Sequence, residues 1–159
     1  MKMQTASVVI KVYSREVNIT RTMGLDVGDR RIGVALSDPG GVLASPFTII
    51  ERADVDQSIT AIADIVQKQE ISLIIAGLPQ SLSGAEGQQA EKVRVFIQKL
   101  SERVPVPVVF RDERLSTVAV NRLMRSVGSH KGKRKERQDA RAAAVILQGY
   151  LDEGKNPVT

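Results

Sequence analysis

The chain has 159 residues and a formal net charge of +5, with 42% hydrophobic and 26% charged residues, as expected for one soluble globular domain. It contains no cysteine and a single histidine, His130, which excludes disulfides, thiolate nucleophiles, cysteine-ligated zinc and multi-histidine metal sites. An enzyme of this composition has to work with carboxylates, hydroxyls, lysines or backbone amides.

The N-terminal residues 1–20 alternate apolar and polar side chains around residues 8–13. They could add an edge strand to a sheet, or they could be an extension upstream of a domain that begins near Met23. No apolar run approaches the ~20 residues that span a bilayer, and the short apolar run near the N-terminus is too short for a signal peptide. We therefore expect a cytoplasmic protein with one domain over residues 21–153 and a tail over residues 154–159.

The first part of this domain has the pattern of three antiparallel strands. Residues 22–38 contain two apolar strands joined at Gly28 and Asp29, a dipeptide suited to a two-residue hairpin. A glycine pair then breaks the chain, and residues 42–50 predict a third strand, interrupted by Pro46.

Helices and strands alternate after this meander. The hydrophobic pattern predicts four further elements, which are a helix over 54–69, a strand over 71–76, a helix over 85–103 and a strand over 108–110. Ser83 and Glu86 have the spacing of a capping box at the start of the second helix. The two continuous apolar runs are typical of strands buried on both faces.

Two more helices are predicted in the last third of the chain, one after Ser116 and Thr117 and one over residues 138–151, with a flexible loop at residues 128–135 between them. The order βββαβαβαα indicates an α/β fold with a mixed five-stranded sheet, in which three antiparallel strands precede two parallel ones and helices flank both faces. Ligands of such sheets gather at the carboxyl ends of the central strands.

Positive charge is concentrated near the C-terminus. Eight basic residues and only two acids stand between Arg122 and Arg141, whereas the rest of the chain is nearly neutral. This segment favours contact with a polyanion, nucleic acid first, although a solvated surface loop explains it equally well. With 3% aromatic residues the protein has few platforms for stacked bases, so we expect it to recognise phosphates and shape. The favoured phosphate contacts, as a group, are Lys133, Arg134, Lys135 and Arg137.

Three carboxylates stand where a site could form. Asp26 lies inside the first strand of the domain, where a charge is costly unless it is paired or bound to metal. Glu113, preceded by Asp112, follows the last strand, and Asp139 begins a helix rich in small residues. Each acid also has a purely structural interpretation. Asp26 would accept amide hydrogen bonds from the following turn, Glu113 would interact favourably with a helix dipole, and Asp139 would cap its helix.

Converging carboxylates repel one another, so divalent cations would be needed to hold the three together. Sites made only of oxygen ligands suit Mg²⁺ or Mn²⁺ and support in-line hydrolysis of phosphodiesters. This interpretation makes Asp26, Asp139 and an acid at the end of the last strand, Asp112 or Glu113, catalytic acids and metal ligands. A non-catalytic nucleic-acid or ribosome-binding module, in which the acids are structural, is the alternative from another class.

Four ordered motifs resemble the YqgF (RuvX) family. They are Gly24-Leu25-Asp26-x-Gly28 with Ile32-Gly33-Val34-Ala35, then Gly77-Leu78-Pro79 with Gly84 and Phe96, then Asp112-Glu113-Arg114-Leu115-Ser116-Thr117, and finally Asp139-x-x-Ala142-Ala143. The match covers roughly residues 21–153. The resemblance implies an RNase H-like fold related to RuvC resolvases and a role as a pre-16S rRNA nuclease, with resolution of Holliday junctions as the older assignment.

The resemblance also carries roles over to single residues. It implies that Asp26, Glu113 and Asp139 are the catalytic acids and metal ligands of the site, with Asp112 as an additional ligand. Arg114, Ser116 and Thr117 are further candidates for nucleic-acid contact; for Ser116 or Thr117 the first interpretation is a helix cap, and phosphate contact is the second. Arg141 stands where a small or neutral residue is expected, which bears on how closely the last helix packs. The expected partners are pre-rRNA or branched DNA and precursors of the small ribosomal subunit, bound by a monomer or a homodimer without a membrane.

Overall fold

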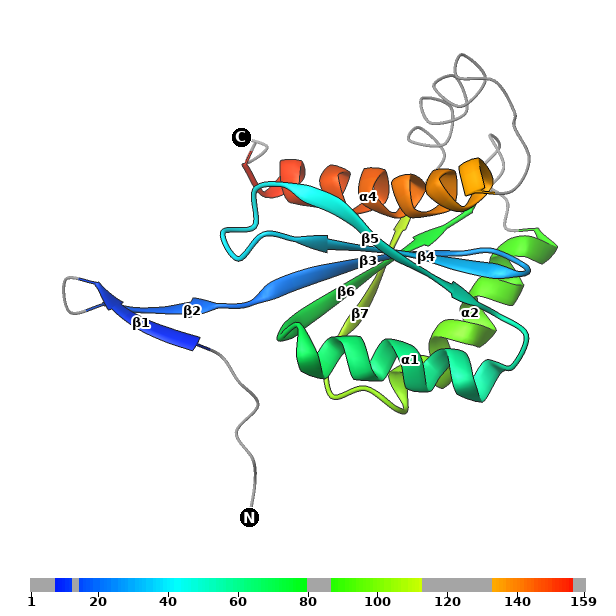
Figure 1. Ribbon diagram of the computed structural model, residues 1–159, viewed down its shortest axis with the longest axis horizontal. Coiled ribbons are helices and arrows are strands. Elements are labelled where there is room, and N and C mark those ends of the chain that lie inside the picture. Colours follow the sequence, from blue (N-terminus) through cyan, green and yellow to red (C-terminus); the bar gives the residue numbers. More distant parts are fainter. Residues whose placement is uncertain (1–7, 13–14, 80–86, 113–132, 156–159) are drawn as a thin grey trace.

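A five-stranded sheet forms the centre of the protein, and helices cover both of its faces (Figure 1). The structure, a computed structural model, describes the backbone of residues 8–12, 15–79, 87–112 and 133–155. It describes side chains for residues 20–79, 87–112 and 140–153. Within these described ranges, no helix is both long and apolar enough to cross a membrane.

The sheet has the strand order β5-β4-β3-β6-β7. The antiparallel strands β3 (Arg21–Val27), β4 (Arg31–Ser37) and β5 (Ala44–Glu51) come first in the chain. Strand β6 (Ile71–Leu78) pairs parallel to β3, and β7 (Val108–Asp112) pairs parallel to β6. The predicted mixed sheet of three antiparallel and two parallel strands is confirmed. Because β3, β6 and β7 run in the same direction, their carboxyl ends share one edge of the sheet.

Helices α1 (Val55–Lys68) and α2 (Gln88–Ser101) cover one face of the sheet, and α4 (Lys133–Lys155) covers the other (Figure 1). Helix α1 agrees with its predicted range. Its N-cap Asp54 accepts a hydrogen bond from the Gln57 amide at 3.1 Å, which satisfies one of the free amides of the first turn.

Helix α2 begins later than predicted. Its N-cap is Gly87, which offers no side chain to the first turn, so the capping box expected at Ser83 does not start this helix. Ser83 and Glu86 lie outside the described residues. The sequence therefore predicted the presence of α2 correctly and its first residue wrongly.

Helix α4 begins at Lys133, ahead of the predicted start near residue 138. Residues 133–135, expected in a flexible loop, are therefore helical. Lysine, arginine and glutamate are good helix formers, and no glycine or proline occurs between Gly132 and Gly149. The helix predicted after Ser116 and Thr117 falls outside the described residues.

The N-terminal strands stand apart from the main sheet. Strands β1 (Val8–Val12) and β2 (Arg15–Ile19) pair with each other in a separate antiparallel sheet. This hairpin projects away from the main sheet and leads into β3 (Figure 1). The alternative that residues 1–20 add an edge strand to the main sheet is therefore wrong, because β5 and β7 are its edges.

The turn between β3 and β4 is centred on Asp29 and Arg30, one residue later than the predicted Gly28-Asp29 hairpin. The Gly28 amide donates to the Arg31 carbonyl oxygen at 2.8 Å and closes the turn. A Cβ at Gly28 would lie 2.9 Å from that same oxygen, so a glycine belongs at this position because its neighbour approaches so closely.

The two faces of the sheet carry different packing. Beneath α1 and α2 lies the larger apolar core, which includes Met23, Leu25, Val27, Ile74 and Phe96. A smaller cluster beneath α4 consists of Ala35, Ile75, Ala143, Ile146, Leu147 and Leu151. At Gly24 a Cβ would lie 2.7 Å from Leu147 Cβ and 2.8 Å from the Ala143 carbonyl oxygen. Helix α4 therefore lies directly on the β3 backbone.

The loop between β4 and β5 is organised by one carboxylate. Asp38 Oδ1 accepts hydrogen bonds from the amides of Val42 at 2.7 Å and Leu43 at 2.8 Å. These bonds, of which the one from Leu43 has the larger effect, hold the pKa of the Asp38 carboxyl below its ordinary value of 3.8.

Strand β5 then starts at Ala44 and contains a bulge at Phe47, because Pro46 pairs with Ala35 while Thr48 pairs with Val34.

We expect Gly24→Ala to lower the free energy of unfolding by about 1–3 kcal/mol, because the added methyl group has to push α4 away from β3. Chemical denaturation followed by circular dichroism measures the change. Gly87→Ala is the matched control, since its Cβ meets nothing within 4 Å, and we expect less than about 1 kcal/mol for the loss of a helix-cap glycine. Equal effects of the two variants would contradict this account of α4 packing.

The stabilising contribution of Asp38 should depend on pH with a definite sign. Since its folded-state pKa lies below the ordinary 3.8, the contribution is fully present above 3.8 and is lost as the pH falls through the depressed pKa. We expect Asp38→Asn to be less stable than the wild type at neutral pH. The difference should shrink as unfolding is measured at decreasing pH below 3.8. A difference that does not depend on pH would contradict the assignment.

Candidate active site

Asp26 lies one residue before the end of β3, on the face of the sheet that α4 covers. Strand alternation gives this placement, because Leu25 and Val27 belong to the core beneath α1 and α2 while Gly24 contacts α4. The side chain of Asp26 is half-buried. A carboxylate in this position is partly withdrawn from water and close to the shared carboxyl edge of the parallel strands.

Glycine flanks Asp26 on both neighbouring strands. Its antiparallel partner on β4 is Gly33. On β6, Ala76 pairs with Leu25, so that Gly77 is level with Asp26. Side chains of directly opposed residues stand about 5 Å apart in a sheet, and here neither neighbour has one. No side chain of a directly opposed strand residue therefore stands beside Asp26 on the α4 face.

Arg52 fixes the turn that follows Asp26. Its Nη1 donates to the Gly28 carbonyl oxygen at 2.8 Å, and its backbone amide donates to the Arg30 carbonyl oxygen at 2.8 Å. Its guanidinium also lies over the Phe96 ring of α2, 5.0 Å from the ring centroid, a cation–π contact. The turn, the end of β5 and α2 are thereby held together beside the candidate site.

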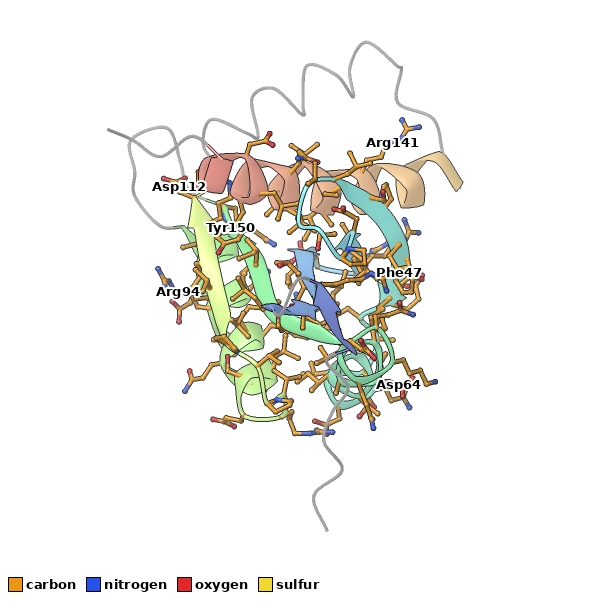
Figure 2. The ribbon with its side chains drawn as sticks, turned by 90° about the vertical axis from the view of Figure 1, so that its left-hand side faces the viewer. Phe47, Asp64, Arg94, Asp112, Arg141 and Tyr150 are labelled. Carbon is orange, nitrogen blue, oxygen red and sulfur yellow. The ribbon has the colours of Figure 1, made fainter. Side chains whose placement is uncertain are left out.

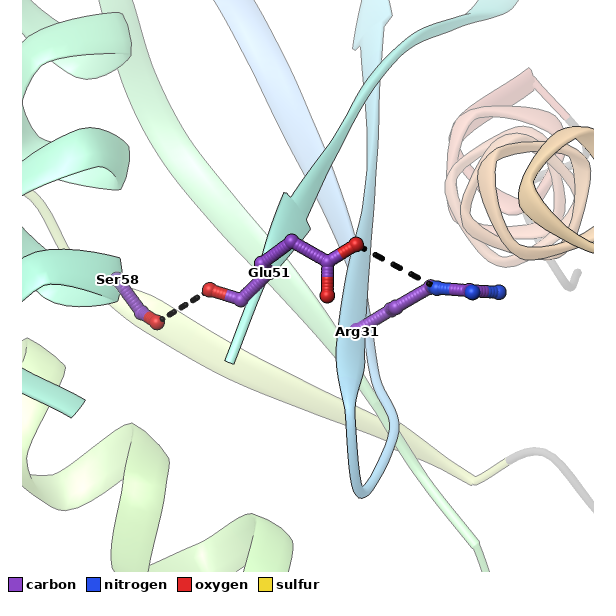
Figure 3. A network of polar contacts seen from close by, with 3 residues as sticks. All are labelled: Arg31, Glu51 and Ser58. Atoms are coloured by element: carbon purple, nitrogen blue, oxygen red, sulfur yellow. Dashed lines mark hydrogen bonds and ion pairs between the residues drawn. The ribbon is translucent and has the colours of Figure 1, made fainter. Parts of the chain in front are cut away.

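A second polar network links the same turn to α1 (Figure 3). Arg31 at the start of β4 lies with its Nε 3.6 Å from Glu51 Oε1 at the end of β5. The hydroxyl of the buried Ser58 on α1 donates to the Glu51 carbonyl oxygen at 3.0 Å. The strand ends at this edge are therefore connected to the helix layer on the opposite face.

Two charged residues end β7 at the same edge. Arg111 pairs with Gly77 in the row of Asp26, and Asp112 pairs with Leu78 one row further on. Arg111 lies on the α4 face, where it forms an ion pair with Glu153 of α4. Asp112 is exposed at the end of the strand (Figure 2), and alternation gives it the opposite face from Asp26.

Helix α4 runs antiparallel to β3. Gln148 Oε1 accepts a hydrogen bond from the amide of Ala44. Ala44 pairs with Ser37, the last residue of β4, which lies near the start of β3. Ala143, which comes earlier in the helix, lies at Gly24, further along β3. The first half of α4 therefore extends towards the carboxyl edge of β3 (Figure 1).

Asp139 stands on α4 one turn before Ala143. Because the helix begins at Lys133, Asp139 is not at its N-terminus, and the alternative that Asp139 caps the helix is wrong. The face that includes Ala140 and Ala143 is buried, as the small-residue pattern predicted. Arg141 is exposed and points away from the sheet (Figure 2), so its charge does not disturb this packing.

The remaining sequence candidates are only partly covered by the structure. Glu113, Arg114, Ser116 and Thr117 lie outside the described residues. The backbone of Lys133, Arg134, Lys135 and Arg137 forms the first turns of α4, without described side chains. Among the side chains that are described, no group of three or more histidines or carboxylates is placed to hold a metal ion.

Sequence patterns did not reveal three polar residues that organise this region, which are Arg52, Arg111 and Gln148. Each acts through a partner distant in the chain, so periodicity and local motifs carry no signal for it. The sequence signal nearest to them is Gly24 in the motif Gly24-x-Asp26, because a glycine permits another backbone to approach closely. It does not identify the three polar residues.

Known proteins resemble this chain over most of its length. The family model described as "RuvX: Holliday junction resolvase" matches residues 20–153. A protein of Desulforamulus reducens named "Putative pre-16S rRNA nuclease" is 46% identical over 134 residues, which is 84% of this chain and 98% of that protein. One of the same name from Moorella thermoacetica is 43% identical over 139 residues, 87% and 99% of the two chains.

Solved structures of two resolvases have the same fold. Thermus thermophilus RuvC in complex with a Holliday junction substrate aligns with a TM-score of 0.50 at 11% identity, over 86% of this chain and 96% of that one. The fowlpox virus resolvase, also with Holliday junction DNA, aligns with a TM-score of 0.53 at 11% identity, over 86% and 100%. The predicted RNase H-like fold is confirmed. Together with the family match over most of its length, this shows that the chain belongs to the RuvX family.

Proposed function

We propose that this protein is a divalent-metal-dependent nuclease that hydrolyses phosphodiester bonds of structured RNA in the 5′-end processing of pre-16S rRNA. Relatives that carry this name are 43–46% identical to it over nearly their whole length, which supports a hydrolytic nuclease. Such a reaction belongs in the cytoplasm, on precursors of the small ribosomal subunit. The observation that carries the proposal is Asp26, set between two glycines at the sheet edge towards which α4 extends.

The register of α4 on β3 favours convergence of Asp26 and Asp139. Ala143 contacts Gly24, and Asp26 is two residues further along the strand, or about 6.6 Å. Asp139 is four residues back along the antiparallel helix, or about 6 Å. Leu147 also lies at Gly24, and counted from it Asp139 is eight residues back, or about 12 Å. From either contact, the two acids are displaced in the same direction, towards the carboxyl edge of β3.

Strand alternation favours Glu113 as the third acid. Arg111 lies on the α4 face in the row of Asp26, and Asp112 is level with Leu78 of the opposite core. Continuation of β7 by one residue would return Glu113 to the α4 face. Asp112 is then an outer carboxylate of the edge, available as an additional ligand.

These residues fit a magnesium or manganese site. Asp26, Glu113 and Asp139 would supply only oxygen ligands, which hard divalent cations prefer, and the strand residues opposite Asp26, Gly33 and Gly77, have no side chains. Such ions, when bound, activate water and neutralise charge on the leaving oxygen. The three carboxylates would hold the ions and orient the scissile phosphate at the carboxyl edge of the sheet.

Basic and hydroxyl residues near this edge would hold the substrate. Lys133, Arg134, Lys135 and Arg137 belong to the first turns of α4, the end of the helix that extends towards the carboxyl edge. With Arg114, Ser116 and Thr117 they would contact backbone phosphates, which position a nucleic acid without reading its sequence.

A branched DNA is the second candidate substrate. The family description and the titles of both solved resolvase structures name Holliday junctions. The same carboxylates would serve either substrate. A two-fold symmetric junction requires a homodimer for paired cuts, whereas processing of one RNA end does not.

We expect the wild-type protein to cut a labelled pre-16S 5′ fragment in Mg²⁺ or Mn²⁺, and Asp26→Asn to lose at least about 100-fold in rate while still binding the RNA, because it would lose a metal ligand. Gel assays of cleavage and of binding measure the two effects. The matched control is Asp64→Asn on α1, an exposed acid on the opposite side of the sheet that pairs with Lys68 (Figure 2); it should cut like the wild type.

A four-way DNA junction tested in parallel separates the candidates. Cleavage of the junction without cleavage of the RNA would replace the rRNA assignment by junction resolution. Binding of both substrates without cleavage in either metal, by the wild type and Asp26→Asn alike, would instead favour the non-catalytic module.

A further inference from the structure

The second half of α4 is held on both flanks by polar contacts, whereas among the side chains described in its first half, Ala140 and Ala143 lie buried against the sheet. The polar contacts come from Gln148 towards the β4–β5 loop and from Glu153 towards β7. Asp139 is in the first half. The placement of this half therefore depends on contacts one to three turns away.

Gln148 uses both ends of its amide. Its Oε1 accepts from the Ala44 amide at 2.9 Å, and its Nε2 donates to the Val42 carbonyl oxygen at 2.9 Å and to Asp152 Oδ1 at 2.9 Å. The amide therefore binds the loop as a neighbouring strand would. Since Asp38 already holds this loop in one conformation, Gln148 docks on a preformed surface.

Arg111 provides the contact on the other flank. It forms an ion pair with Glu153 and passes beside Gly149, where a Cβ would lie 2.8 Å from Nη2 and 3.0 Å from Cζ of the guanidinium. Glycine at position 149 thus admits the guanidinium to the helix surface. The Arg111 side chain is 20% exposed, so that most of it is enclosed between β7 and α4.

Directional contacts add precision here to the apolar packing of Ile146, Leu147 and Leu151, because the small residues nearer Asp139 do little to define a position along the helix axis. Ala140 and Ala143 present a nearly smooth surface to the sheet, and apolar burial is non-directional. Hydrogen bonds and ion pairs weaken when their geometry changes. A slide of α4 by one ångström would keep most of its apolar contact but would break the Gln148 bridge.

From this geometry we infer that Gln148, together with the Arg111–Glu153 pair, positions Asp139 opposite Asp26 by setting the register of α4 on the sheet. The inference rests on the proposed carboxylate site and adds to it the residues that hold its parts at the correct spacing. Gln148, Arg111 and Glu153 are positioning residues, because they act on the site through α4.

The test uses Gln148→Met in the full-length protein, which keeps the length of the side chain and removes its hydrogen bonds. We expect weaker Mn²⁺ binding without substrate and a lower kcat, each by on the order of 10-fold or more, with little change in KM. Titration calorimetry measures Mn²⁺ binding, and hydrogen exchange should show faster exchange of the α4 amides before Ala143. Asp64→Asn, which breaks an ion pair remote from α4, is the control and should change neither Mn²⁺ binding nor kcat.

Glu153→Gln is a second, independent variant, because it removes the charge opposite Arg111 at a side chain that is 62% exposed. If Gln148→Met does not fold, Glu153→Gln still tests whether these contacts position Asp139. The same loss of Mn²⁺ affinity is expected for it. Folded variants that bind Mn²⁺ and turn over like the wild type, with only a lower melting temperature, would overturn the inference. A wild-type protein that binds no Mn²⁺ would overturn the carboxylate site itself, and the positioning role with it.

Discussion

The close approach of α4 to β3 is the constraint on which the rest of the site depends. At Gly24 there is no room for a Cβ between the strand and the backbone of the helix at Ala143. This contact sets the distance between the two elements that carry Asp26 and Asp139. A larger residue on either side would separate them by the thickness of a side chain, more than a shared cation tolerates.

The two faces of the sheet differ in their packing, since one carries the larger apolar core and the other carries the candidate site. The face beneath α1 and α2 buries the long apolar side chains, Phe96 and Met23 among them, and supplies most of the hydrophobic stabilisation. The α4 face has a small apolar cluster, glycines beside Asp26 and directional polar bridges at Gln148 and Arg111. A weak but well-defined contact of this kind can hold charged groups, because it leaves space next to the strand backbone and still specifies register.

Local patterns predicted some elements better than others. The range of α1 was predicted closely because its apolar stripe and its Asp54 cap agree. The starts of α2 and α4 were wrong for opposite reasons, since a capping pattern at Ser83 was taken for a helix start and the basic run at Lys133 was taken for a loop. Charge density said little about backbone conformation there, whereas intrinsic helix propensity favoured the helix that forms.

By itself, the sequence determined the fold class and the family motifs, and it predicted three acids as oxygen ligands, because periodicity and short motifs are properties of neighbouring residues. Only the tertiary structure decided the register of α4 on β3, the glycine neighbours of Asp26, and the roles of Arg52, Arg111 and Gln148. These features join residues as far apart as Val42 and Gln148. Contacts across such separations form only when the sheet and its helices have packed together, so they leave no local signal in the chain.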